Sequence, residues 1–158
     1  MTDTMPQVGQ PAPGFSGATE NGTIIASPNY LGKWVVLYFY PKDNTPGCTK
    51  EACSLRDNIQ AISDVNAVVI GVSLDDPESH KKFIEKFGLP FTLIADTNHA
   101  ISSRYGVYGE KVRCGKVSLG ITRTTFLIDP TGIIRKVFSK VDVDSHGEEV
   151  LKAIRDAR

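Results

Sequence analysis

The longest apolar segments of the chain predict strands that are buried on both faces. Residues 34–40, WVVLYFY, form an unbroken run of apolar, aromatic and β-branched residues. Residues 67–73, AVVIGVS, have the same character, and residues 91–95, FTLIA, predict a third strand. Because these runs are continuous rather than alternating, the strands are expected inside a sheet that is covered on both sides.

Two further strands are predicted in the second half of the chain. Residues 124–128 and 133–138 flank residues 129–132, DPTG. The Asp, Pro and Gly of this tetrapeptide suit the first, second and fourth positions of a type I turn, so the two strands are expected to form a hairpin. The first 22 residues are rich in Pro, Gly and small polar residues and are expected to be an irregular lead-in.

A helix is predicted directly after the first strand. Pro41 ends that strand, since proline cannot donate to a central ladder. Thr45 is then placed as the N-cap and Pro46 at the first helical position. Apolar residues follow at helical spacing, namely Ala52, Leu55, Ile59 and Ile62.

Three more helices are expected. The second begins at residues 76–77, Asp-Pro, which repeat the cap-plus-proline start, and ends at Gly88. A short helix is expected near residues 99–104. Ser145 and Glu148 predict a capping box at the start of a final helix.

The order of elements predicts the fold class. Strand–helix–strand–helix–strand implies parallel strands joined by right-handed crossovers, and the later hairpin adds an antiparallel edge. We therefore predict an α/β protein with a thioredoxin-like fold, in which helices flank a central mixed β-sheet. No linker or repeat interrupts the pattern, so residues 1–158 are expected to form a single thioredoxin-like domain.

Composition and charge exclude several classes of protein. Hydrophobic residues make up 41% and charged residues 23% of the 158-residue chain, close to globular averages. Eighteen Lys and Arg residues balance 18 Asp and Glu residues, so no broad field attracts nucleic acid or an anionic membrane. The longest apolar run is far shorter than the roughly 18–20 residues of a membrane span. The N-terminus does not resemble a signal peptide, and we expect a soluble, cytoplasmic protein.

The candidate chemistry centres on Cys48. It lies in the segment PKDNTPGC, which connects the carboxyl end of a central strand to a helix, where open α/β sheets bind their ligands. With Thr45 as the N-cap, Cys48 falls in the first helical turn, where the helix dipole and free N–H groups favour a thiolate and can bind an oxyanion. Gly47 leaves the approach open, and the Thr45 hydroxyl can accept from the first turn or face the sulfur. The alternative is an inert buried thiol.

Ionisation of this thiol does not suffice for fast chemistry. An unperturbed cysteine is already about 3% thiolate at pH 7, so full ionisation gains only about 30-fold. A less basic thiolate is also a weaker nucleophile. Fast attack therefore needs donors that follow charge onto a leaving oxygen in the transition state, and a buried or half-buried arginine is the natural candidate.

Cys53 lies five residues after Cys48. In an ideal helix the two Cα atoms would be roughly 8–9 Å apart. A disulfide requires about 4.4–6.8 Å, so the pair can bond only if the first helical turns unwind. A merely buried Cys53 is the alternative. A zinc site is disfavoured, because no second ligand pair and no neighbouring histidine accompany the two cysteines.

The segment around Cys48 resembles a known family. Residues 41–48 have the P-x-x-x-T-x-x-C arrangement of the peroxiredoxins, and PKDNTPGCTKEAC followed by Arg-Asp resembles the PrxQ group, also called bacterioferritin comigratory proteins. The resemblance covers nearly the whole chain. It includes VGQPAPGF near the start, IGVSLDDPESHKKFIEKFGLPFTLIAD in the middle and GITRTTFLIDPTG near the end.

The resemblance implies a thiol-dependent peroxidase that reduces hydrogen peroxide and organic hydroperoxides. Cys48 matches the peroxidatic cysteine, which becomes a sulfenic acid. Cys53 matches the resolving cysteine, which would condense with it to an intramolecular disulfide. Arg123 matches the active-site arginine, Pro41 the proline that shields the sulfenic acid, and Thr45 the hydroxyl that positions the peroxide.

The resemblance also implies the partners. Family members need no metal, haem or flavin cofactor, are usually re-reduced by thioredoxin or a similar dithiol, and are often monomers in this group. Cys114 matches no motif position. It is interpreted as a spare thiol in a loop or strand end, with a second resolving or intermolecular cysteine as the alternative.

Two other functions are considered, together with titratable residues outside the Cys48 motif. A thioredoxin-like protein disulfide oxidoreductase would use a C-x-x-C pair, and the gap of four between Cys48 and Cys53 speaks against it. A binding or chaperone module with an inert thiol is the third class. The three histidines are expected to be solvated or satisfied, and Glu51 is a candidate acceptor for Arg123 or Arg56. The histidines are His80, His99 and His146.

Overall fold

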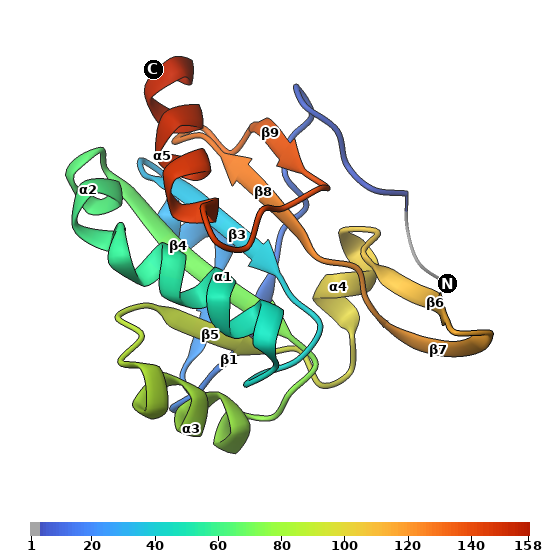
Figure 1. Cartoon of the computed structure of the whole chain (residues 1–158). Coiled ribbons are helices and arrows are strands. Elements are labelled where there is room, and N and C mark those ends of the chain that lie inside the picture. The colour runs from blue at the N-terminus through green and yellow to red at the C-terminus, as the bar shows by residue number, and fades with distance from the viewer. Residues whose placement is uncertain (1–3) are drawn as a thin grey trace.

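The computed structural model describes residues 4–158. A seven-stranded sheet runs through the centre of the protein, as Figure 1 illustrates. The strand order is β2-β1-β5-β4-β3-β8-β9. Strands β3, β4 and β5 run parallel to one another, whereas the other neighbouring pairs are antiparallel. The sheet is therefore mixed, as predicted. Its strands are β1 (Ser16–Thr19), β2 (Ile24–Ala26), β3 (Trp34–Phe39), β4 (Ala67–Ser73), β5 (Thr92–Ala95), β8 (Thr124–Ile128) and β9 (Ile134–Phe138).

Helices cover the sheet on both faces. The longer ones, α1, α2, α3 and α5, pack on one face, against the side chains of alternate β3 residues such as Val36 and Tyr38. The short α4 and the base of a separate hairpin pack on the other face, together with Leu37 and Phe39. Every β3 residue is thus buried, as its continuous apolar run predicts. The helices are α1 (Pro46–Asp57), α2 (Ile59–Asp64), α3 (Pro77–Phe87), α4 (Ala100–Arg104) and α5 (His146–Ala157).

Local signals placed several elements correctly. Asp76 caps α3 by accepting from the backbone N–H of Ser79 at 2.8 Å, and Gly88 ends this helix in the left-handed conformation with φ 61°. The turn between β8 and β9 closes with a hydrogen bond from the Gly132 N–H to the Asp129 carbonyl at 2.9 Å. No helix within residues 4–158 is long and apolar enough to cross a membrane.

Four strands were not predicted. The expected irregular lead-in contains β1, and β2 follows it; β1 is held to the sheet by antiparallel pairing with β5. The hairpin formed by β6 (Tyr108–Arg113) and β7 (Lys116–Ile121) projects from the body of the fold (Figure 1). Its outer residues are exposed, so no burial pattern marks them in the sequence.

The helix expected from Pro46 to Ile62 is broken at Asn58. The Asn58 N–H bonds to the Leu55 carbonyl, and its side-chain amide donates to the Ser54 carbonyl at 2.9 Å and to Glu148 Oε1 at 3.2 Å.

The predicted capping box at the start of α5 is wrong. The Ser145 side chain makes no cap bond, and the Glu148 side chain bonds to Asn58 at the end of α1 instead.

The start of α5 is clamped to α1 by a second contact. The Gly147 N–H donates to Ser54 Oγ at 2.9 Å. A Cβ atom at residue 147 would lie only 2.4 Å from the Ser54 carbonyl oxygen, so glycine is needed for this close approach. We refer to Ser54, Asn58, Gly147 and Glu148 as the α1–α5 clamp.

Candidate active site

Cys48 lies in the first turn of α1, directly after the loop that leaves the carboxyl end of β3. Its side chain is 1% exposed. Thr45 is the N-cap residue, with extended backbone angles, and its carbonyl accepts the first helical bond from the Thr49 N–H at 2.8 Å. The helix start therefore agrees with the prediction.

The Thr45 hydroxyl has neither of the two roles that the sequence suggested for it. It makes no cap bond and does not bond to the sulfur; it donates to the Lys42 carbonyl at 2.8 Å. The N–H groups of the first turn consequently remain free of a Thr45 side-chain cap, which suits the binding of an oxyanion. Pro41 is half-buried at the start of the same loop.

Arg123 reaches Cys48 from the segment between β7 and β8. Its Nη2 donates to Cys48 Sγ at 3.3 Å, and its Nη1 donates to Glu51 Oε1 at 2.5 Å. One guanidinium thus joins two residues of α1 that lie three positions apart on one helix face. A Cβ atom at Gly47 would lie 3.1 Å from Arg123 Nη2, so the glycine makes room for the guanidinium.

Glu51 holds the far side of this guanidinium and is fully buried. Burial raises the pKa of Glu51 to about 7, although the charge and hydrogen bonds of Arg123 pull it down. Burial by itself would lower the pKa of Arg123, but Glu51 and Cys48 outweigh it and raise that pKa, so Arg123 stays charged. A charged N–H donor of fixed orientation therefore faces the sulfur.

His146 completes this buried network and was not predicted as a site residue. It is fully buried at the start of α5, with Nε2 2.8 Å from Thr125 Oγ1 and 3.8 Å from Glu51 Oε2. Glu51 Oε2 has no hydrogen-bond partner among residues 4–158. Burial lowers the pKa of His146, which its bond to Glu149 partly opposes. The expectation of a solvated or satisfied histidine is confirmed in its second form, because hydrogen bonds engage both ring nitrogens of this buried residue.

The other two cysteines lie in different settings. Cys53 is half-buried and, like Cys48, lies in α1. Neither cysteine is in a disulfide, so both thiols are free. Cys114 is exposed in the turn of the β6–β7 hairpin, with φ 53°. The structure thus places the Cys48–Cys53 pair in one helix and Cys114 at the tip of a projecting hairpin (Figure 1).

Comparison with known proteins assigns the chain to a family. The AhpC/TSA family matches residues 8–137. Peroxiredoxin Bcp of Bacillus subtilis is 44% identical over 150 residues, which cover 95% of this chain and 96% of the relative. The chain is a peroxiredoxin of the Bcp/PrxQ group. Peroxiredoxins are thiol-dependent peroxidases, so this protein is an enzyme that reacts through a cysteine thiol.

Solved structures of related proteins support a thioredoxin-like fold for this peroxiredoxin. A PrxQ variant from Xylella fastidiosa superposes with a TM-score of 0.91 at 33% identity and covers 98% of both chains. The bacterioferritin comigratory protein of Xanthomonas campestris, solved with trapped intermediates and ligands to study its alkyl peroxide reduction, gives a TM-score of 0.85 at 36% identity and covers 90% of this chain and 91% of the relative. The thioredoxin-like fold prediction is confirmed.

Proposed function

We propose that Cys48 is the peroxidatic cysteine of this peroxidase. Its thiolate attacks one oxygen of a peroxide, an S–O bond forms as the O–O bond breaks, and the leaving oxygen takes a proton to become water or an alcohol. Cys48 is left as a sulfenic acid. The observation that carries this proposal is the hydrogen bond from Arg123 to Cys48 Sγ, with Glu51 fixing the guanidinium from behind.

Arg123 has two tasks in this scheme. Before attack, its Nη2 stabilises the thiolate. As the O–O bond stretches, negative charge moves onto the leaving oxygen, and a guanidinium held in place by Glu51 can stabilise that charge without reorganising. Thr45 and Pro41 are assigned to the peroxide pocket, because both lie in the loop that delivers the chain from β3 to Cys48.

Cys53 is proposed as the resolving cysteine. Its thiol condenses with the Cys48 sulfenic acid, which forms a disulfide and releases water. Since both residues are helical in the reduced protein, the first turns of α1 must unwind before the sulfurs meet. A dithiol such as thioredoxin then reduces the disulfide by exchange.

The substrate class is hydrogen peroxide together with organic hydroperoxides. The alkyl peroxide reduction studied in the Xanthomonas campestris relative supports this assignment. We further infer a cytoplasmic monomer that folds as one domain and needs no metal or other cofactor, as the resemblance to the PrxQ group implies.

The test is NADPH consumption in the presence of thioredoxin, thioredoxin reductase and peroxide. Wild type is expected to turn over, and Cys48→Ser to lose essentially all activity, because an alcohol is hardly ionised at pH 7. Cys114→Ser is the matched control and is expected to keep the wild-type rate. Turnover by Cys48→Ser would refute the proposed nucleophile, and reduction of insulin by the wild type would favour protein disulfide exchange.

A further inference from the structure

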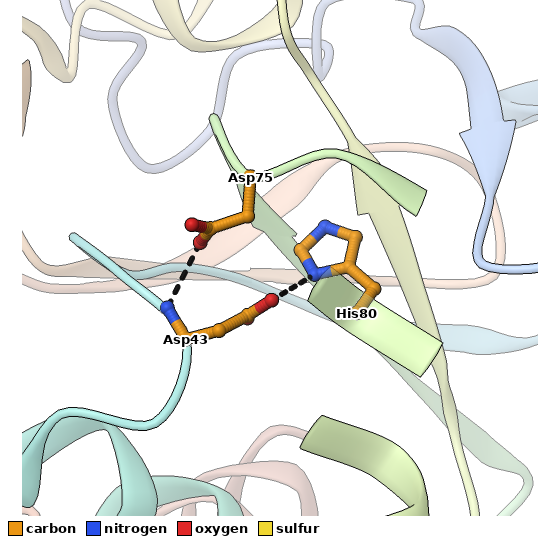
Figure 2. A group of neighbouring side chains, drawn as sticks. All are labelled: Asp43, Asp75 and His80. Atoms are coloured by element: carbon orange, nitrogen blue, oxygen red, sulfur yellow. Dashed lines mark hydrogen bonds and ion pairs between the residues drawn. The ribbon is translucent and has the colours of Figure 1, made fainter. Parts of the chain in front are cut away.

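A second buried polar cluster lies beside the loop that leads to Cys48. Asp43 belongs to this loop, and its side chain is almost fully buried. Asp43 Oδ1 accepts from the Tyr40 hydroxyl at 2.5 Å, and Oδ2 lies 2.8 Å from Ser79 Oγ and 2.7 Å from His80 Nδ1. Figure 2 shows the Asp43 carboxylate facing the His80 ring, while the Asp75 carboxylate accepts from the Asp43 backbone N–H.

These bonds tie the loop to two other parts of the fold. His80 and Ser79 belong to α3, and Asp75 lies between β4 and α3. Oxygen and nitrogen atoms of Asp43, Asp75 and His80 lie within 4.8 Å of one another. Hydrogen bonds already engage both Asp43 oxygens and both His80 nitrogens, so the cluster is a closed hydrogen-bond network.

The geometry fixes where the protons lie. His80 Nε2 is 2.9 Å from the Ile94 carbonyl, which only accepts, so Nε2 carries a hydrogen. Asp43 already accepts from the Tyr40 hydroxyl, and the Ser79 hydroxyl donates to it as well, which favours its carboxylate form. The short Nδ1–Oδ2 contact then needs a second hydrogen on His80, which makes its ring an imidazolium.

This inference rests on the proposed role of Cys48. We propose that the buried Asp43–His80 ion pair is a positioning device for the peroxidase reaction, which holds the Pro41–Thr45 loop in place while His80 carries both ring protons. Asp43 lies two residues before Thr45 and five before Cys48, so a displacement of Asp43 is transmitted directly to the peroxide pocket.

The sign of the pH dependence follows from the surroundings of His80. The titratable groups that face it are Tyr40 after β3, Asp43 in the loop and Asp75 after β4, and β5 contributes the Ile94 carbonyl. Burial lowers the pKa of His80, but Asp43 and the carbonyl outweigh it and raise that pKa above the usual 6.5. Because the pKa of His80 is higher in the folded than in the unfolded protein, the ion pair stabilises the native loop fully below about pH 6.5. This stabilisation is lost as the pH rises through the pKa of His80 in the folded protein.

The experiment measures single-turnover oxidation of Cys48 by hydrogen peroxide as a function of pH. In wild type, the rate is expected to rise with the thiolate fraction and then fall on the alkaline side, as His80 loses its proton. In His80→Gln the alkaline fall should disappear, and the rate at pH 7 should drop about 10-fold through misplacement of the loop. Ser79→Ala, which removes an uncharged donor to the same carboxylate, is the matched control and should keep the alkaline fall.

A second measurement, made on the wild type, depends neither on activity nor on the folding of a variant. The ¹⁵N chemical shifts of His80 in the wild type are expected to show protons on both ring nitrogens at pH 7. Asp43→Asn should convert the ring to its neutral form at that pH, and the double variant with His80→Gln should react no more slowly than His80→Gln does. A neutral His80 at pH 7, or an unchanged alkaline fall in His80→Gln, would overturn the proposal. Failure of the proposed function would instead appear as peroxide consumption by Cys48→Ser.

Discussion

Replacing Arg123 by alanine separates two effects that the same hydrogen bond produces. Loss of the Nη2 donor at 3.3 Å lowers the thiolate fraction of Cys48, which costs about 30-fold at pH 7 for a change from full ionisation to that of an ordinary cysteine. Loss of a charged donor to the leaving oxygen costs about 1.5–3 kcal/mol in addition, or roughly 10- to 150-fold in rate. The combined loss at pH 7 is therefore expected to exceed the factor that ionisation alone explains.

The two effects are resolved by pH. Alkylation with iodoacetamide reports the thiolate fraction, and stopped-flow oxidation by hydrogen peroxide reports attack. At a pH where wild type and Arg123→Ala are both fully thiolate, the ionisation factor vanishes, and the variant should still react at least about 10-fold more slowly. The alkaline fall expected from His80 affects both proteins alike, so it cancels in their ratio.

Arg123→Lys is the matched variant for this measurement. It keeps the positive charge, but an ammonium lacks the planar fork that reaches Cys48 and Glu51 together. It should restore most of the thiolate fraction and only part of the attack rate. If Arg123→Ala equals the wild-type rate once both are fully ionised, Arg123 acts on ionisation alone and the transition-state role is wrong.

Three further predictions concern α1. Cys53→Ser should reduce one equivalent of peroxide and then stall as a sulfenic acid that over-oxidises readily, as mass spectrometry of the thiol products would show; normal cycling that is lost only when Cys114 is also replaced would make Cys114 the resolving thiol. Amides at about residues 46–56 should exchange faster in the oxidised than in the reduced protein, because the disulfide requires an unwound turn; equal protection would contradict this. Gly47→Ala should leave the free energy of unfolding unchanged or raise it by up to about 1 kcal/mol, while it slows peroxide attack, because the added Cβ would lie 3.1 Å from Arg123 Nη2 and displace it; Gly109→Ala, whose added Cβ would meet no atom within 4 Å, should not change the rate of attack.

Local sequence signals predicted the central strands because burial on both faces leaves a continuous apolar run. That condition holds for β3, in which every residue is buried, and largely for β4. It fails for β1, whose four residues are small or polar and whose place depends on pairing with β5, some 75 residues away. The break at Asn58 was missed for the same reason, since its partner Glu148 lies 90 residues along the chain.

The candidate site shows the same division. Cys48, Thr45 and Pro41 lie in one short segment, which is why their proximity could be read from the chain. Arg123 came from the family resemblance, and its bond to Glu51 spans 72 residues. The placement of His146 behind Glu51 has no local signal, because a histidine at a helix start has the same sequence pattern whether it is buried or solvated.

The α1–α5 clamp divides the catalytic helix into a part that can open and a part that remains folded. Ser54 and Asn58 are fixed to α5 by Gly147 and Glu148, and this anchorage begins one residue after Cys53. Unwinding that stops at the clamp breaks on the order of four or five backbone hydrogen bonds, about 4–5 kcal/mol at a net ~1 kcal/mol each, a cost in the range of local rather than global opening. Any side chain at position 147 would collide with the Ser54 carbonyl oxygen and the Asn58 side chain, so α5 would have to move away from α1 and the clamp would loosen. The oxidation cycle thus draws on a small, bounded fraction of the folding free energy, and a glycine nearly one hundred residues from Cys48 sets that boundary.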